Sequence, residues 1–228
     1  MRLYYFTSDA VAIQHILPER RLKLSQFHEL NDPFELEAFA LGDKKLRQIA
    51  RALQREYFGK KGIICFSDNW RSPVMWAHYA IKHSGICFGF DIGRDGADDD
   101  IVRQVAYESD RLRFQLQDGV PLFGIDENFV KAMLYTKANE WAYEREWRVT
   151  ADLAVRDLQT GFHYVDFGPQ MQLREVILGA RNHRTPEKVA NLVSKNLSDV
   201  TVFKTRPAFR RFAMTRDRLT PRIIVQGE

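Results

Sequence analysis

Short apolar runs of strand length recur along all 228 residues of the chain, and polar or glycine-containing turns separate them. Such runs favour β-strands, because alternate side chains can then pack on one face of a pleated sheet. None of them approaches the roughly 20 apolar residues that a membrane-spanning helix needs. We predict strands in the segments that read R-L-Y-Y-F, R-L-K-L-S, G-I-I-C-F-S, G-I-C-F-G-F-D-I, V-R-Q-V-A-Y-E, F-H-Y-V-D-F, E-V-I-L-G, V-T-V-F-K-T, F-R-R-F-A-M and R-I-I-V.

Helical periodicity occurs between these strands, mainly in the first two thirds of the chain. Apolar residues between 43 and 58 recur at the spacing of one helix face, namely Leu46, Ile49, Ala50, Leu53 and Tyr57. A helix is predicted after Ser8 or Asp9, either of which can cap it, and Pro18 should end it; further helices are predicted after the caps Ser72, Asp126 and Thr185. This mixture predicts an α+β fold, with one domain over residues 1–228 and two packed, mainly antiparallel sheets flanked by helices.

The two cysteines, Cys65 and Cys87, both lie inside apolar runs and belong to no C-x-x-C or Cys/His cluster. We therefore interpret them as buried thiols of a protein in the reducing cytoplasm; a disulfide or a metal pair is the alternative. The N-terminal residues lack the apolar core of a signal peptide, which also favours a cytoplasmic location.

Basic residues are concentrated near the C-terminus. The segment from Lys204 to Arg222 holds seven basic residues and a single acid, Asp217. A segment of this kind can follow a phosphate backbone, so nucleic acid is a candidate partner. An ordinary strand pair with a solvated basic face explains the same pattern.

The stretch D-N-W-R-S-P-V-M-W-A-H-Y predicts an anion site at the start of a helix. Ser72 is a good N-cap, and Pro73 loses no hydrogen bond in the first turn. Free N–H groups and the helix dipole attract an anion there, and Arg71 adds a permanent positive charge beside them. We predict that Arg71 and Ser72 bind the pyrophosphate of a dinucleotide; a plain helix start with a solvated arginine is the alternative.

Three residues on this helix are candidates for contact with a base or a nicotinamide ring. Trp76 and Tyr79 can stack on such a ring, and His78 can donate or accept a hydrogen bond. The alternative is that Trp76 and Tyr79 pack in the core while His78 satisfies a buried hydrogen bond.

Residues 141–149 read W-A-Y-E-R-E-W-R-V and combine strand-forming residues with four ionisable ones. In a strand, Glu144, Glu146 and Arg148 share one face, and the mostly apolar other face should meet the core. The two carboxylates then lie about 7 Å apart along the strand. One could stabilise a developing cation while the other positions a nucleophile. A solvated face with a Glu146–Arg148 ion pair is the alternative.

Several of these blocks resemble, in content and order, the signature of a bacterial domain family of unknown function. They are L-Y-Y-F-T-S, N-D-P-F-E, I-C-F-S, M-W-A-H-Y, G-I-C-F-G-F, W-A-Y-E-R-E-W-R and V-I-L-G. The resemblance extends over nearly the whole chain and implies no function.

A second resemblance is to the DNA-targeting ADP-ribosyltransferase toxins, through F-T, R-S-P-V-M-W and E-W-R-V in the same order. It implies that Arg71 binds the phosphates of NAD and that Glu146 stabilises the oxocarbenium-like transition state. Glu144 takes the first position of an E-x-E pair. Phe6 stands where these toxins commonly have histidine, so recognition of the nicotinamide ribose falls to another residue, for which Asn31 is a candidate.

The leading hypothesis is therefore an ADP-ribosyltransferase-like enzyme that uses NAD as substrate, without a metal. A second is a metal-dependent nuclease or phosphodiesterase with a cation held by Asp32, Glu35, Glu144 and Glu146. A third is a non-enzymatic module, such as a nucleotide sensor in phage defence.

Overall fold

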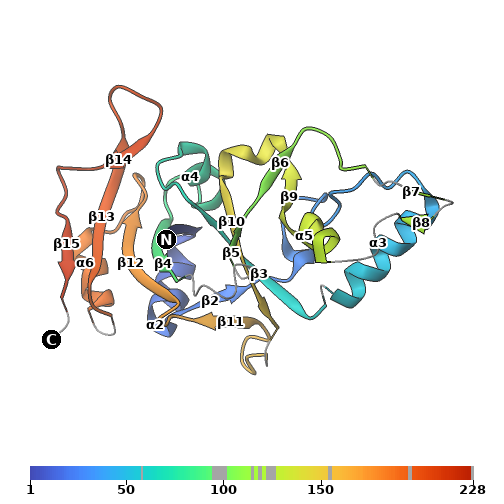
Figure 1. Cartoon of the computed structure of the whole chain (residues 1–228). Helices are drawn as coiled ribbons and strands as arrows, with labels where there is room; N and C mark the ends of the chain where they lie inside the picture. Colours follow the sequence, from blue (N-terminus) through green and yellow to red (C-terminus); the bar gives the residue numbers. More distant parts are fainter. Residues whose placement is uncertain are drawn as a thin grey trace. The chain divides into compact units, whose positions relative to one another are not determined.

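The computed structural model describes residues 1–57, 59–93, 102–113, 116–117, 120–121, 127–153, 156–194 and 197–226 (Figure 1). Its helical segments are α1 (Asp9–Val11), η1 (Ala12–Ile16), α2 (Leu17–Glu19), η2 (Phe27–Glu29), α3 (Lys44–Tyr57), α4 (Pro73–Tyr79), α5 (Glu127–Tyr135), η3 (Asn139–Glu144) and α6 (Pro186–Val193). Its strands are β1 (Arg2–Thr7), β2 (Arg21–Leu24), β3 (Lys61–Ser67), β4 (Ile86–Ile92), β5 (Val102–Gln104), β6 (Ala106–Glu108), β7 (Leu116–Gln117), β8 (Val120–Pro121), β9 (Thr136–Ala138), β10 (Glu146–Asp152), β11 (His163–Asp166), β12 (Met171–Leu178), β13 (Val200–Pro207), β14 (Met214–Arg216) and β15 (Ile223–Val225). The predicted α+β class with mainly antiparallel pairing is confirmed.

The chain forms two compact units and passes between them more than once. Unit 1 consists of Met1–Leu22, Cys65–Asp99 and Tyr164–Glu228. Unit 2 consists of Lys23–Ile64 and Asp100–His163. The single domain over residues 1–228 stays a prediction.

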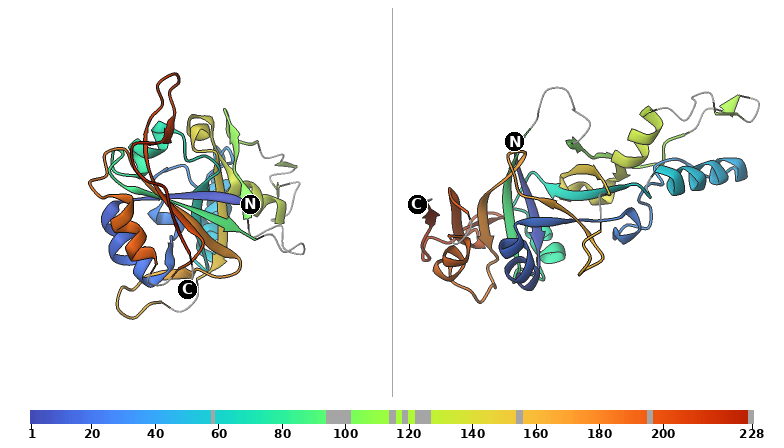
Figure 2. Two further views of the ribbon diagram at one scale, coloured as in Figure 1. Left: turned by 90° about the vertical axis from the view of Figure 1, so that its left-hand side faces the viewer. Right: turned by 90° about the horizontal axis from the view of Figure 1, so that it is seen from below.

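Unit 1 is built on a sheet in the order β14-β13-β12-β4-β1, followed by the C-terminal half of β3. Strands β1 and β4 pair antiparallel with Leu3 opposite Phe90. Strands β12 and β13 pair parallel, and α6 forms the crossover between them. Figure 2 shows α6 beside the N-terminal helical turns, with which it is in contact through α2.

The predicted caps of the unit 1 helices are confirmed. The side chain of Ser8 accepts a hydrogen bond from the backbone N–H of Val11, and Thr185 accepts one from Lys188. Pro18 does not end the first helical segment as its position suggests, because it occupies the first turn of α2. That segment ends instead at Arg20, in a left-handed conformation with φ 52°.

One predicted strand is wrong. The segment F-R-R-F-A-M forms no strand over residues 209–213, and β14 begins only at Met214. Residues 208–213 are instead the connection of the β13–β14 hairpin, closed by a hydrogen bond from Ala208 N to Ala213 O at 2.8 Å. The phenylalanines that suggested a core-facing strand are exposed to solvent on this connection.

Unit 2 contains α3, α5, η3 and the strand pairs β10–β5 and β6–β9. Two residues of the predicted α3 stripe, Leu46 and Ala50, are buried. The predicted cap Asp126 lies outside the described residues. No helix in the described ranges is long and apolar enough to cross a membrane.

The two cysteines form no disulfide and lie in different environments. Cys87 is completely buried in β4, as predicted, whereas Cys65 in β3 is half-buried. Burial raises the pKa of the Cys87 thiol well above its usual value, and the nearby Glu175 carboxylate adds to the effect.

We expect Cys87 to resist alkylation in the folded protein, because a buried thiol that is not ionised is a poor nucleophile. In a Cys65→Ser variant, iodoacetamide at mildly alkaline pH should label Cys87 only after urea is added, as followed by mass spectrometry. Labelling of the native variant as fast as that of a free thiol would contradict the burial of Cys87.

Candidate functional site

Five charged side chains of unit 2 come together away from solvent. We call them the buried charge cluster: Glu35, Lys137, Glu144, Glu146 and Arg148. Each of these side chains is at most 5% exposed. Charged groups are rarely buried unless they are paired, because removing a charge from water costs free energy. Such a cluster is stable only if the charged groups are held in a specific geometry.

Arg148 joins two carboxylates from distant parts of the chain. Its Nε donates to Glu146 Oε1 at 2.8 Å and its Nη2 to Glu146 Oε2 at 3.1 Å. The same Nη2 donates to Glu35 Oε1 at 2.8 Å, and Nη1 donates to the carbonyl oxygen of Leu134. Both oxygens of Glu146 are therefore already engaged by one guanidinium group.

Lys137 lies among all three carboxylates of the cluster. Its Nζ is 2.7 Å from Glu144 Oε2, 3.3 Å from Glu146 Oε2 and 3.4 Å from Glu35 Oε1. Burial alone would lower the pKa of this ammonium group, but the carboxylates outweigh it and hold the pKa above its usual value. Lys137 thus remains charged throughout the physiological pH range.

Local structure explains how the sequence brings these groups together. Lys137 is the central, inward residue of β9. After Glu144 ends η3, Arg145 adopts a left-handed conformation with φ 47°, and β10 starts at Glu146. Strand alternation then directs Glu146 and Arg148 to the same buried side. The hydroxyl oxygen of Tyr107 accepts the backbone N–H of Glu146 at 2.8 Å.

The N-D-P-F-E stretch supplies Glu35. Asp32 forms a turn: its Oδ1 accepts the backbone N–H of Phe34 at 2.9 Å. The backbone N–H of Glu35 donates to the carbonyl oxygen of Asp32 at 3.1 Å. This turn leaves Asp32 5% exposed and turns the Glu35 side chain toward Arg148.

Two carboxylate oxygens beside the cluster lack a hydrogen-bond partner among the described residues: Oδ2 of Asp32 and Oε2 of Glu35, both buried. A buried polar atom without a partner is costly, and such atoms are uncommon in folded proteins. Both residues line one cavity of unit 2 with a volume of about 460 Å³. Further lining residues are His28, Glu37, Gln54 and Arg55.

The W-A-Y-E-R-E-W-R-V segment is a strand only from Glu146 onward, because Asn139–Glu144 form η3, and its predicted orientation is also wrong. Glu144, Glu146 and Arg148 were expected on an ionic, accessible face, but they are 4%, 3% and 0% exposed. Trp147 and Val149, expected in the core, are half-buried. The reversal is possible because Lys137 and Arg148 together neutralise most of the charge of the three carboxylates.

The residues predicted to bind a dinucleotide lie mainly in unit 1, whereas Glu144 and Glu146 lie in unit 2. Arg71 is exposed, with its guanidinium group over the ring of Trp70 at 4.4 Å. Ser72 caps α4, as predicted, by accepting the backbone N–H of Met75.

The aromatic residues of α4 differ in exposure. Trp76 is 0% exposed and meets the ring of Phe6 edge-on at 5.2 Å, so it packs in the core and presents no face to a ligand. His78 is exposed rather than buried. Its ring lies edge-on to that of the half-buried Tyr79, with the ring centroids 6.2 Å apart. Asn31, predicted at the ribose, is an exposed residue of unit 2 that directly precedes Asp32.

Three of the four carboxylates considered for a metal site do converge: Glu35, Glu144 and Glu146. The positive charges among them are those of Lys137 and Arg148. Within the described ranges, no group of three or more His, Cys, Asp or Glu side chains is arranged to hold a metal ion. Sequence reasoning missed Lys137, whose only signal is its position in the short strand pattern Y-T-K-A just before W-A-Y-E.

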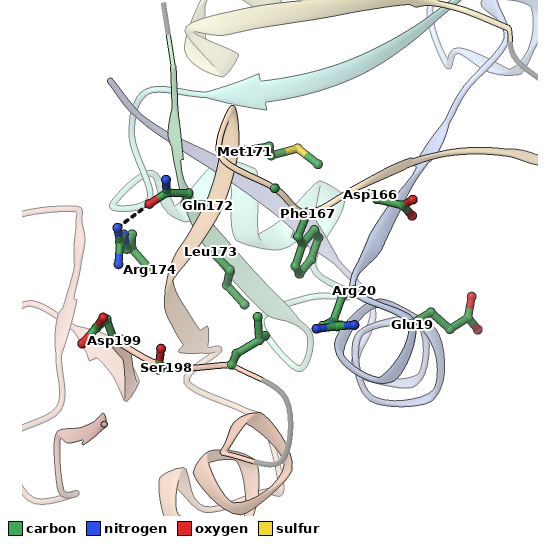
Figure 3. A pocket seen from close by; sticks show the side chains of 12 residues that line it. Glu19, Arg20, Asp166, Phe167, Met171, Gln172, Leu173, Arg174, Ser198 and Asp199 are labelled. Carbon is green, nitrogen blue, oxygen red and sulfur yellow. Dashed lines mark hydrogen bonds between the residues drawn. The ribbon is translucent and has the colours of Figure 1, made fainter. Parts of the chain in front are cut away.

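Unit 1 contains a larger cavity, of about 710 Å³, in which side chains of both charges surround Phe167 and Leu173 (Figure 3). Arg20 and Arg174 line it together with Glu19, Asp166 and Asp199. None of these residues has a buried side-chain atom without a partner in the described part of the chain. The cavity of unit 2 is therefore the better candidate for a site that a ligand completes.

Comparisons with known proteins identify one related family. The family model matches residues 75–149, about a third of the chain, and this stretch contains the M-W-A-H-Y and W-A-Y-E-R-E-W-R blocks. The comparisons with curated proteins and with solved structures give no significant match, so the resemblance to ADP-ribosyltransferase toxins stays a prediction. As the signature blocks predict, the chain is similar over residues 75–149 to a domain family described as protein of unknown function (DUF2971).

Proposed function

We propose that the protein cleaves the nicotinamide–ribose bond of NAD and transfers ADP-ribose to an acceptor, and that the ribose binds in the cavity beside the buried charge cluster. The observation that carries this proposal is the pair of buried carboxylates, Asp32 and Glu35, which line one cavity and each keep an oxygen without a donor among the described residues. Ribose hydroxyl groups are donors of the required kind.

Glu35 has the properties needed for the central role in this reaction. When the C1′–N bond breaks, its electron pair leaves with nicotinamide and positive charge develops on the ribose ring. A fixed carboxylate beside the ring stabilises that charge. Arg148 at 2.8 Å and Lys137 at 3.4 Å hold Glu35 Oε1 in place, whereas the buried Oε2 has no hydrogen-bond partner among the described residues. The acceptor then bonds to C1′ and loses its proton.

Other residues of the same cavity suit the rest of the substrate. Arg55 and Gln54, from α3, are donors for a diphosphate, while Phe27 and Leu30 offer apolar surface to the nicotinamide ring. In this proposal Glu144 and Glu146 act as positioning residues, since they fix Lys137 and Arg148. The roles predicted for Arg71, Ser72 and Asn31 stay predictions.

We expect Glu35→Gln to lower the rate of nicotinamide release from labelled NAD by at least about 100-fold, because the amide keeps the size but loses the charge. The assay is run with and without nucleic acid as acceptor. Glu37→Gln is the matched control, because Glu37 lines the same cavity but is about one third exposed and is paired with Arg111. It should change the rate less than about threefold.

Thermal unfolding of both variants separates loss of chemistry from loss of fold. The proposal fails if the wild-type protein releases nicotinamide no faster than buffer, or if folded Glu35→Gln matches the wild-type rate. Saturable binding of NAD without any release would instead favour a non-enzymatic nucleotide-binding module.

A further inference from the structure

The β13–β14 hairpin of unit 1 presents an unusual tip, which projects from the sheet (Figure 1, Figure 2). Residues 209–212 read Phe-Arg-Arg-Phe, and all four are exposed; we call them the F-R-R-F tip. Phe209 is 88% exposed and Phe212 is 102% exposed. Isolated apolar residues are common on protein surfaces, but two fully exposed rings within one short loop indicate a contact surface.

The tip is held in a defined shape. Ala208 N donates to Ala213 O at 2.8 Å, and Ala213 N donates to Arg211 O at 2.9 Å, so the loop is closed across its base. The guanidinium group of Arg206 lies over the ring of Phe209 at 4.0 Å. The loop backbone and the Phe209 ring are therefore preorganised in solvent, which lowers the entropic cost of binding a partner.

The charge of the hairpin specifies the kind of partner. Between residues 204 and 216 there are five basic residues and no acidic one. The guanidinium groups of Arg210 and Arg211 are exposed and make no hydrogen bond or ion pair with the described residues. These two arginines lie between the two rings in the sequence, so the partner should offer negative charge and flat apolar faces together.

Positive charge continues from the tip toward the base of the hairpin. Lys204 donates to the carbonyl oxygen of Asn182 at 2.6 Å, which fixes its ammonium group on the surface of unit 1. Met214 N donates to the carbonyl oxygen of Arg71 at 2.8 Å, so the exposed Arg71 stands next to β14. A track of this kind fits a chain of phosphates better than a planar bilayer surface, which would meet the tip alone.

We propose that the F-R-R-F tip binds single-stranded nucleic acid, with Phe209 and Phe212 stacking on bases and Arg210 and Arg211 neutralising phosphates. Unpaired bases expose the ring faces that stacking needs, whereas a duplex hides them. This surface shares no residue with the Asp32–Glu35 cavity. The two proposals can therefore fail independently.

The test is fluorescence anisotropy with labelled oligothymidine over a series of salt concentrations. Phe209→Ala/Phe212→Ala should weaken binding at least about tenfold and leave the salt dependence unchanged. Arg210→Gln/Arg211→Gln should lower the slope of log affinity against log salt by about 1.4, since each phosphate contact contributes about 0.7 on single strands.

Two control variants remove matched surface features elsewhere and should bind as the wild type does. Leu158→Ala/Leu219→Ala removes side chains that are 99% and 94% exposed, and Lys44→Gln/Lys45→Gln removes two exposed charges from α3. The proposal is overturned if the phenylalanine variant keeps wild-type affinity or if the leucine control weakens binding equally. It is also overturned if the rings are needed for binding anionic vesicles but not oligothymidine.

Discussion

Replacing Arg148 with methionine is expected to lower the free energy of unfolding by about 3–5 kcal/mol, the usual cost of removing one partner from a buried ion pair. Methionine fills similar space but makes none of the hydrogen bonds of the guanidinium group to Glu35, Glu146 and Leu134. Three buried carboxylates would then have Lys137 as their sole neutralising partner within the cluster. Urea denaturation followed by circular dichroism measures the loss.

Arg145→Met is the matched control, because Arg145 is an exposed arginine three residues earlier in the same segment. We expect it to change the unfolding free energy by no more than about 0.5–1 kcal/mol. Comparable losses for the two variants would show that Arg148 does not stabilise the fold through its buried contacts.

The double variant Glu146→Met/Arg148→Met separates pairing from packing. Each single variant leaves the charge of the other residue buried without its partner, whereas the double variant removes both charges. The double variant should therefore lose less stability than the sum of the two single variants. A strictly additive loss would contradict strong coupling between Glu146 and Arg148.

Features set by neighbouring residues could be predicted from the sequence. The side chains of the caps Ser72 and Thr185 each accept a hydrogen bond from the backbone N–H of the third residue after them. The local sequence is therefore enough to identify these caps. The turn at Asp32 is local in the same sense, since its carboxylate accepts from Phe34.

The inward direction of the charged face of β10 could not be predicted in this way. Alternation correctly places Glu146 and Arg148 on one side, but it does not say which side is buried. That choice depends on Lys137 and on Glu35, which is 113 residues from Arg148 along the chain. A strand pattern with charges on one face, taken alone, therefore predicts that the charged face is exposed to solvent. In β10, contacts with residues distant in the sequence turn that face inward instead.

The strand predicted over F-R-R-F-A-M is wrong for the opposite reason: apolar residues expected in the core are exposed. Phenylalanines at positions 209 and 212 raise the strand propensity of the segment, and apolar residues are normally inside. The hairpin closes between Ala208 and Ala213 instead, so the rings remain in the loop. This mismatch between strand propensity and exposure is the reason for proposing that the tip binds a partner.

Gly85→Ala should be among the most destabilising single substitutions in unit 1, with a loss of at least about 3 kcal/mol or failure to fold. A Cβ at Gly85 would lie 2.1 Å from the carbonyl oxygen of Thr7 and 2.9 Å from backbone atoms of Ala80. Backbone atoms of β1 and of the end of α4 cannot move aside as a flexible side chain can. The turn before it is already strained, because Ile81, Lys82 and His83 have φ values of 45°, 51° and 72°.

Gly168→Ala is the control for this substitution, since a Cβ there would meet nothing within 4 Å. It should leave stability unchanged or raise it by about 0.4–1 kcal/mol, because alanine restricts the unfolded chain more than glycine does. Urea midpoints of the two variants give the comparison. A Gly85→Ala protein that unfolds at the wild-type midpoint would mean that Thr7 and Ala80 do not approach Gly85 as closely as the structure has them, because a backbone clash of this depth cannot be relieved without separating β1 from β4.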